Sequence, residues 1–268
     1  MNLTGMNEIL LAKDISKTYF DSVANDDVVA LQGVSLGIEA HDFVSVIGPS
    51  GCGKSTFLRI VAGLDTPTSG EILVSGKKVK GPGADRGMVF QEYALLPWKT
   101  TAANIEFGLR LKKMPKVERS AIVRRFIELV GLKGFENKYP HQLSGGMRQR
   151  AAVARVLANN PTILLMDEPF AAVDAMTRQR LQEELTVITA AEHTTVLFVT
   201  HAIDEAVFLS NRVVALSGRP GRIVADIRID LPRPRRWEDL IRDERFIRYR
   251  DGLTQCIHGG TPVHTEHV

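Results

Sequence analysis

Short runs of apolar and β-branched residues recur along the chain, and longer stretches with helical periodicity separate them. A continuous apolar run indicates a strand that is buried on both faces, as in a parallel sheet. The sequence therefore predicts an α/β core. Its predicted strands are Phe43–Ile47, Gly87–Gln91, Thr162–Met166, Thr194–His201 and Arg212–Leu216.

The residues before this core have a different pattern. Ile9–Ile15 is predicted to form a strand, the polar stretch Asp21–Asp27 a hairpin loop, and the alternating stretch Val28–Ile38 a second and a third strand. Gly33 and Gly37 are typical of turn or bulge positions. An antiparallel β layer is therefore expected ahead of the core.

Residues 92–160 contain few strand signals, and Val117–Val130 has helical periodicity. We expect a helical subdomain inserted between core strands. Near its start lies the apolar stretch Leu95–Trp98. This stretch is either a helix-entry turn packed on its own subdomain or a docking surface for a partner.

After the predicted strand Ile223–Ile229 the pattern breaks at Pro232–Arg236. The tail is expected to be helical over Glu238–Leu253 and disordered over Gly259–Val268. We interpret its arginine cluster as a solvated helix, because nearby acidic residues offset the charge. The predicted division is a domain over residues 1–232 and a tail over residues 233–268.

Composition narrows the function classes. The 268 residues are 44% hydrophobic, which suits one large domain, and a net charge of +3 is too small to imply nucleic acid. No secretory leader and no run of about 20 apolar residues is evident. Cys52 and Cys256 are not expected to pair, and sparse cysteine fits a reducing cytosol.

The segment Gly48–Ser55 fits the phosphate-binding pattern G-x-x-x-x-G-K-[ST]. It lies between the predicted strand Phe43–Ile47 and a predicted helix, Thr56–Ala62, which is the context that this loop requires. Glycines let main-chain N–H groups turn toward phosphate oxygens, and the helix N-terminus adds partial positive charge. Lys54 is placed to reach the β- and γ-phosphates, and the Ser55 hydroxyl is placed to bind Mg²⁺.

Polar residues end several predicted strands at the sheet edge where α/β proteins place their ligands. Asp167 is suited to hold Mg²⁺ through water, and Glu168 to orient and polarise an attacking water. His201 ends the next buried strand, and its position alone favours neither a structural nor a catalytic role. Gln91 can reach a metal or a water, although a surface glutamine is the simpler interpretation.

Two further features have two interpretations each. Ser144-Gly145-Gly146 opens a predicted helix and is either a second anion site or an N-cap with flexible glycines. Tyr19, ahead of the phosphate loop, is either a stacking partner for adenine or a half-buried strand tyrosine. Phe20 is the rival for the stacking role.

Taken in order, these motifs resemble the ATP-binding subunits of ABC transporters over nearly the whole chain. They match the aromatic loop, Walker A, Q-loop, signature, Walker B with catalytic glutamate, D-loop and H-loop of that family. The residues that carry the resemblance are Tyr19, Gly48–Ser55, Gln91, Leu143–Gly146, Ile163–Glu168, Asp174 and His201.

The resemblance implies a P-loop NTPase core with a RecA-like parallel sheet, an antiparallel β layer and an inserted α-helical subdomain. It implies ATP and Mg²⁺ as cofactors, with Mg²⁺ held by Ser55, Gln91 and Asp167. The implied catalytic residues are Glu168, His201, Gln91 and Lys54. The implied ATP-binding residues are Tyr19, Gly48, Pro49, Ser50, Gly51, Cys52, Gly53, Lys54, Ser55, Thr56, Ser144, Gly145, Gly146 and Asp174.

The resemblance also implies partners. Two copies would close head to tail, so that Ser144 and Gly146 of one copy contact the γ-phosphate bound by Lys54 of the other. Closure would move two integral membrane permease subunits, placing this chain peripherally on the cytoplasmic face of the membrane. A solute-binding protein would act indirectly. No nucleic acid partner is implied.

Two positions depart from the family pattern. Met147 stands where the signature usually has glutamine, and the D-loop reads Ala171-Ala172-Val173-Asp174 instead of Ser/Gly-Ala-Leu-Asp. The first change affects only the contacts of that amide. Asp174 is retained, so an active site is expected.

The stretches Gln91–Trp98 and Gly218–Arg235 resemble the importers of nitrate, sulfonates and taurine, and Gly81–Gly87 favours the taurine type. The alternatives are import of another small anion, an exporter or lipid-flipping ATPase, and a non-transport ABC protein. Ribosomal members usually carry two cassettes, and DNA-repair members insert long coiled coils that Glu92–His141 cannot hold.

Overall fold

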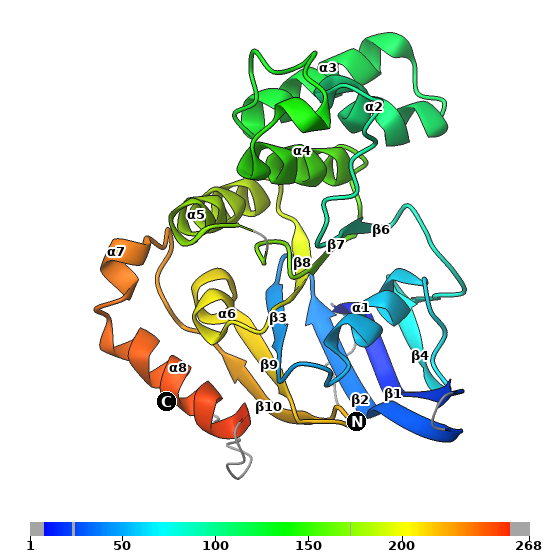
Figure 1. The fold of residues 1–268 in the computed structure, drawn as a ribbon, viewed down its shortest axis with the longest axis vertical. Helices are drawn as coiled ribbons and strands as arrows, with labels where there is room; N and C mark the ends of the chain where they lie inside the picture. The colour runs from blue at the N-terminus through cyan, green and yellow to red at the C-terminus, as the bar shows by residue number, and fades with distance from the viewer. Residues whose placement is uncertain (1–7, 23–24, 172, 258–268) are drawn as a thin grey trace.

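A computed structural model describes residues 8–22, 25–171 and 173–257. Its centre is a six-stranded sheet in the order β10-β9-β3-β8-β7-β6, parallel except for β10 (Figure 1). The predicted parallel core is confirmed. Its strands are β3 Phe43–Ile47, β6 Arg86–Val89, β7 Ile163–Asp167, β8 Thr195–Val199, β9 Arg212–Leu216 and β10 Ile223–Arg228.

A second, antiparallel sheet has the order β2-β1-β4-β5, as the N-terminal pattern indicated. The prediction of two strands over Val28–Ile38 is wrong, because that stretch lies within one long strand. Gly33 has a left-handed φ of 65°, and its N–H donates to Ser16 Oγ at 3.0 Å, so a bulge continues the ladder. The strands are β1 Glu8–Asp21, β2 Asp26–Glu39, β4 Ser69–Val74 and β5 Lys77–Lys78.

Helices α2, α3 and α4 form a lobe beyond one end of the parallel sheet, which agrees with the predicted helical insertion (Figure 1). Within the described residues, no helix is long and apolar enough to cross a membrane. The helices are α1 Lys54–Ala62, α2 Thr101–Leu111, α3 Lys116–Leu129, η1 Pro140–Gln142, α4 Gly145–Leu157, α5 Ala175–Ala191, α6 Ile203–Leu209, α7 Trp237–Leu240 and α8 Glu244–Ile257.

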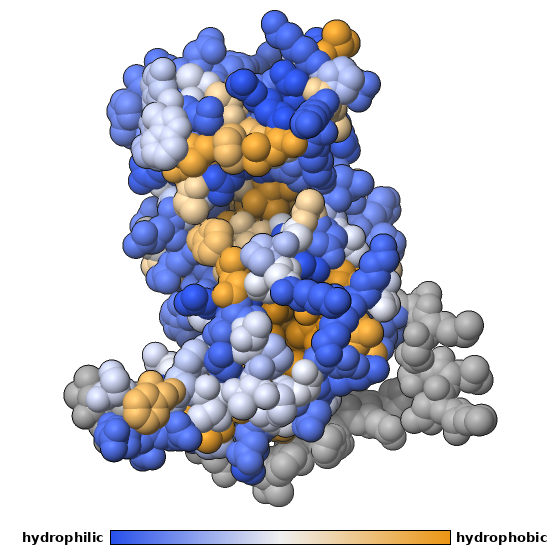
Figure 2. Space-filling view, turned by 90° about the vertical axis from the view of Figure 1, so that its right-hand side faces the viewer, coloured by the Kyte–Doolittle hydropathy of each residue, from blue (hydrophilic) through white to orange (hydrophobic). Residues whose placement is uncertain are grey.

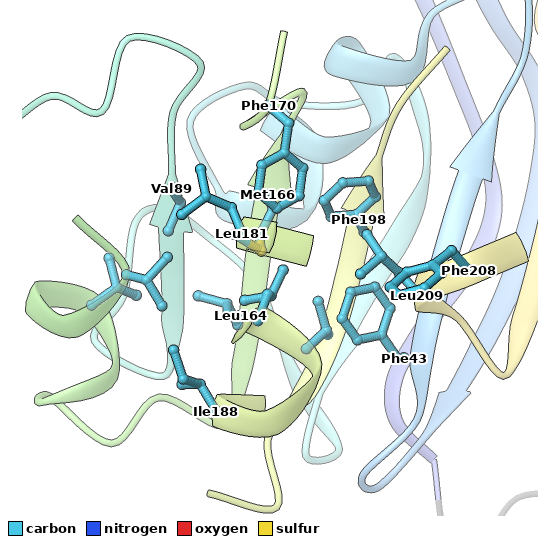
Figure 3. Close-up of a cluster of buried hydrophobic side chains, with 14 of the residues drawn as sticks. Phe43, Val89, Leu164, Met166, Phe170, Leu181, Ile188, Phe198, Phe208 and Leu209 are labelled. Carbon is cyan, nitrogen blue, oxygen red and sulfur yellow. The ribbon is translucent and has the colours of Figure 1, made fainter. Parts of the chain in front are cut away.

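The parallel sheet is buried on both faces because successive side chains of a strand point to opposite sides. Leu164 and Met166 of β7 join the core cluster that includes Phe43, Phe198 and Phe208 (Figure 3). Ile163 and Leu165 join the other cluster, which packs against α1 and the antiparallel sheet. Continuous apolar strands are the consequence of this two-sided burial.

The C-terminal tail differs from its prediction in two ways. One helix over Glu238–Leu253 was expected, but α7 ends at Leu240 and α8 begins at Glu244. The Asp243 carboxylate accepts the Arg245 main-chain N–H at 2.8 Å and so caps α8. Hydrogen bonds from Arg245 lower the pKa of Asp243 to about 2. The predicted disorder of residues 259–268 lies outside the described residues.

The interpretation of the arginine cluster as a solvated helix is wrong for Arg235, which is only 4% exposed and precedes α7. Its Nη1 donates to the carbonyls of Val207, Phe208 and Ser210 at 2.9, 2.8 and 2.7 Å. The last carbonyls of a helix lack partners within the helix, and a cation there also suits the helix dipole. Burial lowers the pKa of Arg235 to about 9, and the charge of Arg233 contributes.

Replacing Arg235 with methionine is expected to destabilise the protein, because buried carbonyls at the end of α6 would lose their donors. The expected loss is about 2 kcal/mol or more, or a fall in melting temperature of roughly 4 °C or more. Thermal unfolding followed by circular dichroism measures it. The matched control, Arg236→Met at an exposed position, should melt like the native chain; equal melting of both variants would contradict the prediction.

Candidate active site

The phosphate-binding loop connects β3 to α1, as its motif predicted. Gly53 precedes the helix in a left-handed conformation with φ 99°, and its carbonyl accepts the Phe57 N–H at 2.8 Å. A Cβ on Gly53 would lie 2.6 Å from Leu31 Cδ2 and 2.8 Å from the Ala30 carbonyl oxygen. Only glycine fits there, so β2 holds the loop from behind.

Lys54 is the first residue of α1 and is only 5% exposed. Its Nζ donates to the main-chain carbonyls of Gly48 and Pro49 at 2.9 and 3.0 Å. The loop therefore curls around the ammonium group, beside the N-terminus of α1. A fixed cation and a helix N-terminus together form a site that suits phosphate.

Ser55 and Asp167 lie 112 residues apart in sequence but are hydrogen-bonded. The Ser55 hydroxyl donates to Asp167 Oδ1 at 2.9 Å, across from α1 to the end of β7. Burial raises the pKa of Asp167, and the hydrogen bond from Ser55 opposes this. A hydroxyl and a carboxylate oxygen are ligands that Mg²⁺ accepts, and phosphate oxygens and water normally complete its shell. The pair therefore fits the predicted metal role.

Glu168 and His201 also meet at this edge. His201 Nδ1 lies 3.0 Å from Glu168 Oε2, and the Glu168 N–H donates to the Val199 carbonyl at 2.9 Å. Glu168 has a left-handed φ of 42°, which is uncommon for a residue other than glycine. A carboxylate next to an imidazole can orient a water and accept its proton.

Tyr19 lies near the end of β1 and is 40% exposed. Its hydroxyl donates to Asp65 Oδ2 at 2.6 Å, and Lys17 Nζ lies 4.7 Å from its ring centroid. Burial and the hydrogen bond to Asp65 raise the pKa of Tyr19. Phe20 is 66% exposed. Tyr19 is thus the ring that has fixed partners, and its stacking on adenine stays a prediction.

Three other predicted site residues stand apart from this cluster. β6 ends at Val89, so Gln91 follows the strand instead of ending it, and it is exposed. Ser144 caps α4 and Asp174 caps α5, with side chains accepting main-chain N–H groups at 3.3 and 3.0 Å. In the part of the chain described here, no hydrogen bond joins any of the three to Lys54 or Glu168.

Sequence reasoning missed several residues that support the site. Asp65, the partner of Tyr19, lies in the turn after α1. Burial raises the pKa of Asp65, but the hydrogen bonds from Lys17 and Tyr19 have the larger effect, so its pKa is lowered. Thr200 directly precedes His201, Glu205 lies four residues after it, and both are buried. A polar residue next to a predicted site residue and an acid early in a predicted helix are the sequence signals that could have identified Thr200 and Glu205.

The comparisons with known proteins agree with this geometry. Residues 31–171 match the ABC transporter family model. The chain belongs to the ABC transporter family. It is an ATPase of the ABC type, and the predicted P-loop NTPase fold is confirmed.

Individual relatives match over most of their length. The chain is 58% identical over 230 residues to an uncharacterized ABC transporter ATP-binding protein, MJ0412, of Methanocaldococcus jannaschii, covering 86% of this chain and 85% of that one. It is 43% identical over 273 residues to the nitrate import ATP-binding protein NrtD of Synechocystis, and the match covers 100% of this chain and 98% of that one.

A solved structure agrees in fold. The dimeric ATP-binding cassette MJ0796 in a post-hydrolysis state, bound to ADP and Pi, superposes with a TM-score of 0.71 at 34% identity. The superposition covers 83% of this chain and 100% of the MJ0796 chain.

Replacing Glu168 with glutamine is expected to lower ATP hydrolysis by about 100-fold or more, because loss of general-base assistance typically costs that much. ATP binding should be retained, since Lys54 and Ser55 are unchanged. Phosphate release and the affinity for a fluorescent ATP analogue measure the two effects. The exposed Glu238 on α7 provides a control, Glu238→Gln; unchanged turnover in Glu168→Gln would remove Glu168 from the role.

Proposed function

We propose that this cassette hydrolyses ATP to drive the import of a small anion through a membrane permease. The observation that supports the chemistry is the convergence of Ser55, Asp167, Glu168 and His201 beside the phosphate loop at one sheet edge. Similarity to the nitrate import protein NrtD over the full chain, tail included, supports the importer class.

Within that class we propose taurine or a related sulfonate as the solute, and nitrate as the alternative. The ATPase does not touch the solute, so the proposal rests on sequence similarity alone. The stretch Gly81–Gly87 favours taurine, whereas the relative NrtD is named for nitrate import. A solute-binding protein and the permease would select the solute.

We propose that the working form contains two copies of this chain. α4, which begins at the signature residues, lies in the helical lobe, whereas α1 lies against the lower body (Figure 1). The two helix N-termini therefore belong to different parts of one copy. In a head-to-tail pair, Ser144 and Gly146 of one copy would complete the nucleotide site around Lys54 of the other.

The permease would dock on the helical subdomain and hold the chain on the cytoplasmic face of the membrane. Apolar side chains gather along the lower edge of this lobe and in the hollow beneath it (Figure 2). A pocket of about 540 Å³ lies between α2 and α3, lined by apolar side chains such as Ala103 and Val123 and by charged ones such as Glu106 and Arg124. These features suit a short amphipathic segment of a partner.

The stretch Leu95–Trp98 would form part of the docking surface. Asn104 fixes this turn, accepting the Leu96 N–H at 2.8 Å and donating to the Leu96 carbonyl at 3.1 Å. Leu95 packs on the core, but Trp98 is left 70% exposed. The turn thus contributes to its own subdomain and presents one large aromatic side chain to a partner.

Trp98→Ala is expected to reduce co-purification with the permease and solute uptake by about tenfold or more, because exposed tryptophans often anchor interfaces. ATP affinity of the isolated chain should not change. Val117→Ala, at an 83% exposed position on α3, serves as the control. Normal assembly of Trp98→Ala would exclude this tryptophan from the interface.

Uptake of labelled taurine and labelled nitrate tests the proposed function. Cells lacking the gene are compared with cells that carry the native gene or Glu168→Gln. Restoration of taurine uptake by the native gene alone is the expected result. Restoration of nitrate uptake alone would identify the alternative solute, and restoration of neither would contradict import of these anions.

A further inference from the structure

The main chain around His201 is held by one buried hydroxyl. Thr200 is 2% exposed, and its Oγ1 donates to Glu205 Oε2 while accepting the Ala202 N–H at 3.1 Å. The residues before and after His201 are therefore tied together. The His201 side chain itself is 62% exposed and its Nδ1 lies 3.0 Å from Glu168 Oε2, so its position depends on this main chain and on Glu168 more than on packing.

Glu205 extends the connection into α6. It is 6% exposed, and its second oxygen, Oε1, accepts the Gln182 side-chain amide at 2.7 Å. Burial raises the pKa of Glu205, and the donors Thr200 and Gln182 oppose this. Each oxygen of this buried carboxyl accepts a hydrogen bond, so Glu205 fixes both Gln182 and Thr200.

Gln182 carries the connection across to the C-terminal tail. It lies on α5, is 2% exposed, and its Oε1 accepts Trp237 Nε1–H at 2.9 Å. An indole N–H can only donate, so the amide oxygen must face Trp237 and the amide nitrogen must face Glu205. Trp237 thereby sets the orientation of Gln182.

Trp237 is itself firmly placed. Its ring stacks on Phe208 with centroids 4.3 Å apart and an interplanar angle of 5°, and it meets Phe246 edge-on at 6.1 Å. Its main-chain N–H donates to Glu183 Oε1 at 3.1 Å. A rigid residue of the tail is thus connected through side chains on α5 and α6 to the segment that bears His201.

We propose that the buried chain Trp237–Gln182–Glu205–Thr200 positions His201, which makes Trp237 a positioning residue for ATP hydrolysis. This inference rests on the proposed catalytic role of His201 and gives the tail a function in the reaction. Rearrangement of α7 relative to α5 would change the orientation of Gln182 and, through Glu205, the main chain on both sides of His201.

Trp237→Phe tests the proposal in the full-length chain, since it keeps an aromatic ring beside Phe208 and removes the donor together with part of the indole. We expect the kcat for ATP to fall roughly three- to tenfold, with KM and ATP affinity unchanged. Tyr249→Phe is the matched control, because it also removes a polar group of the tail, the hydroxyl that accepts the Asp230 N–H at 3.1 Å. An equal fall in both variants would overturn the proposal.

Two further readouts separate positioning from general destabilisation. In a His201→Ala background, Trp237→Phe should cause no additional fall in kcat, because the chain acts through that histidine. The side-chain NMR signals of His201, assigned by difference with His201→Ala, should shift in Trp237→Phe and not in Tyr249→Phe. Additive losses of kcat, or unchanged His201 signals, would overturn the inference.

The NMR comparison needs no turnover. If the native chain failed to bind or hydrolyse ATP, the proposed function would fail, yet the shift of the His201 signals would still test the connection from Trp237.

Discussion

Parallel pairing of β3, β8 and β7 is the constraint on which the site depends. In register, Val46 pairs with Val199, and Val199 pairs with Asp167, so three strands end side by side. The residues that follow these ends, from segments far apart in sequence, must then meet. Apolar burial on both faces of the sheet holds the register, because a slip by one residue would move every side chain to the other face.

Electrostatics explains why this edge can bind a nucleotide. The phosphate loop presents a helix N-terminus and a buried Lys54 whose ammonium is held by two loop carbonyls. Next to this positive region lie Asp167 and Glu168, two acids at the end of an apolar strand. Phosphate would compensate the positive charge and a divalent cation the acids, so binding of only one of the two would leave the other charge uncompensated.

The residues of the tail that the structure describes pack into the core of the domain. Leu240, Phe246 and Leu253 belong to the core cluster that covers one face of the sheet. Arg235 satisfies the carbonyls at the C-terminal end of α6, the short helix that begins two residues after His201. Through α6 the tail is therefore connected to the sheet edge that bears Glu168 and His201, and the buried Glu205 adds a polar connection beside the apolar one.

The sequence by itself determined the core strands, the phosphate loop and the acids at the strand end, because each depends on local pattern and spacing. It also predicted that His201 would lie at the same edge. Only the tertiary structure decided the continuity of β2, the burial of Arg235 and the contact of Trp237 with Gln182. These depend on distant partners: Ser16 lies 17 residues from Gly33, the carbonyls bound by Arg235 lie 25 to 28 residues away, and Gln182 lies 55 residues from Trp237. A residue's own type and its near neighbours carry no signal for such contacts, so an arginine cluster looks solvated until the carbonyls that it satisfies are known.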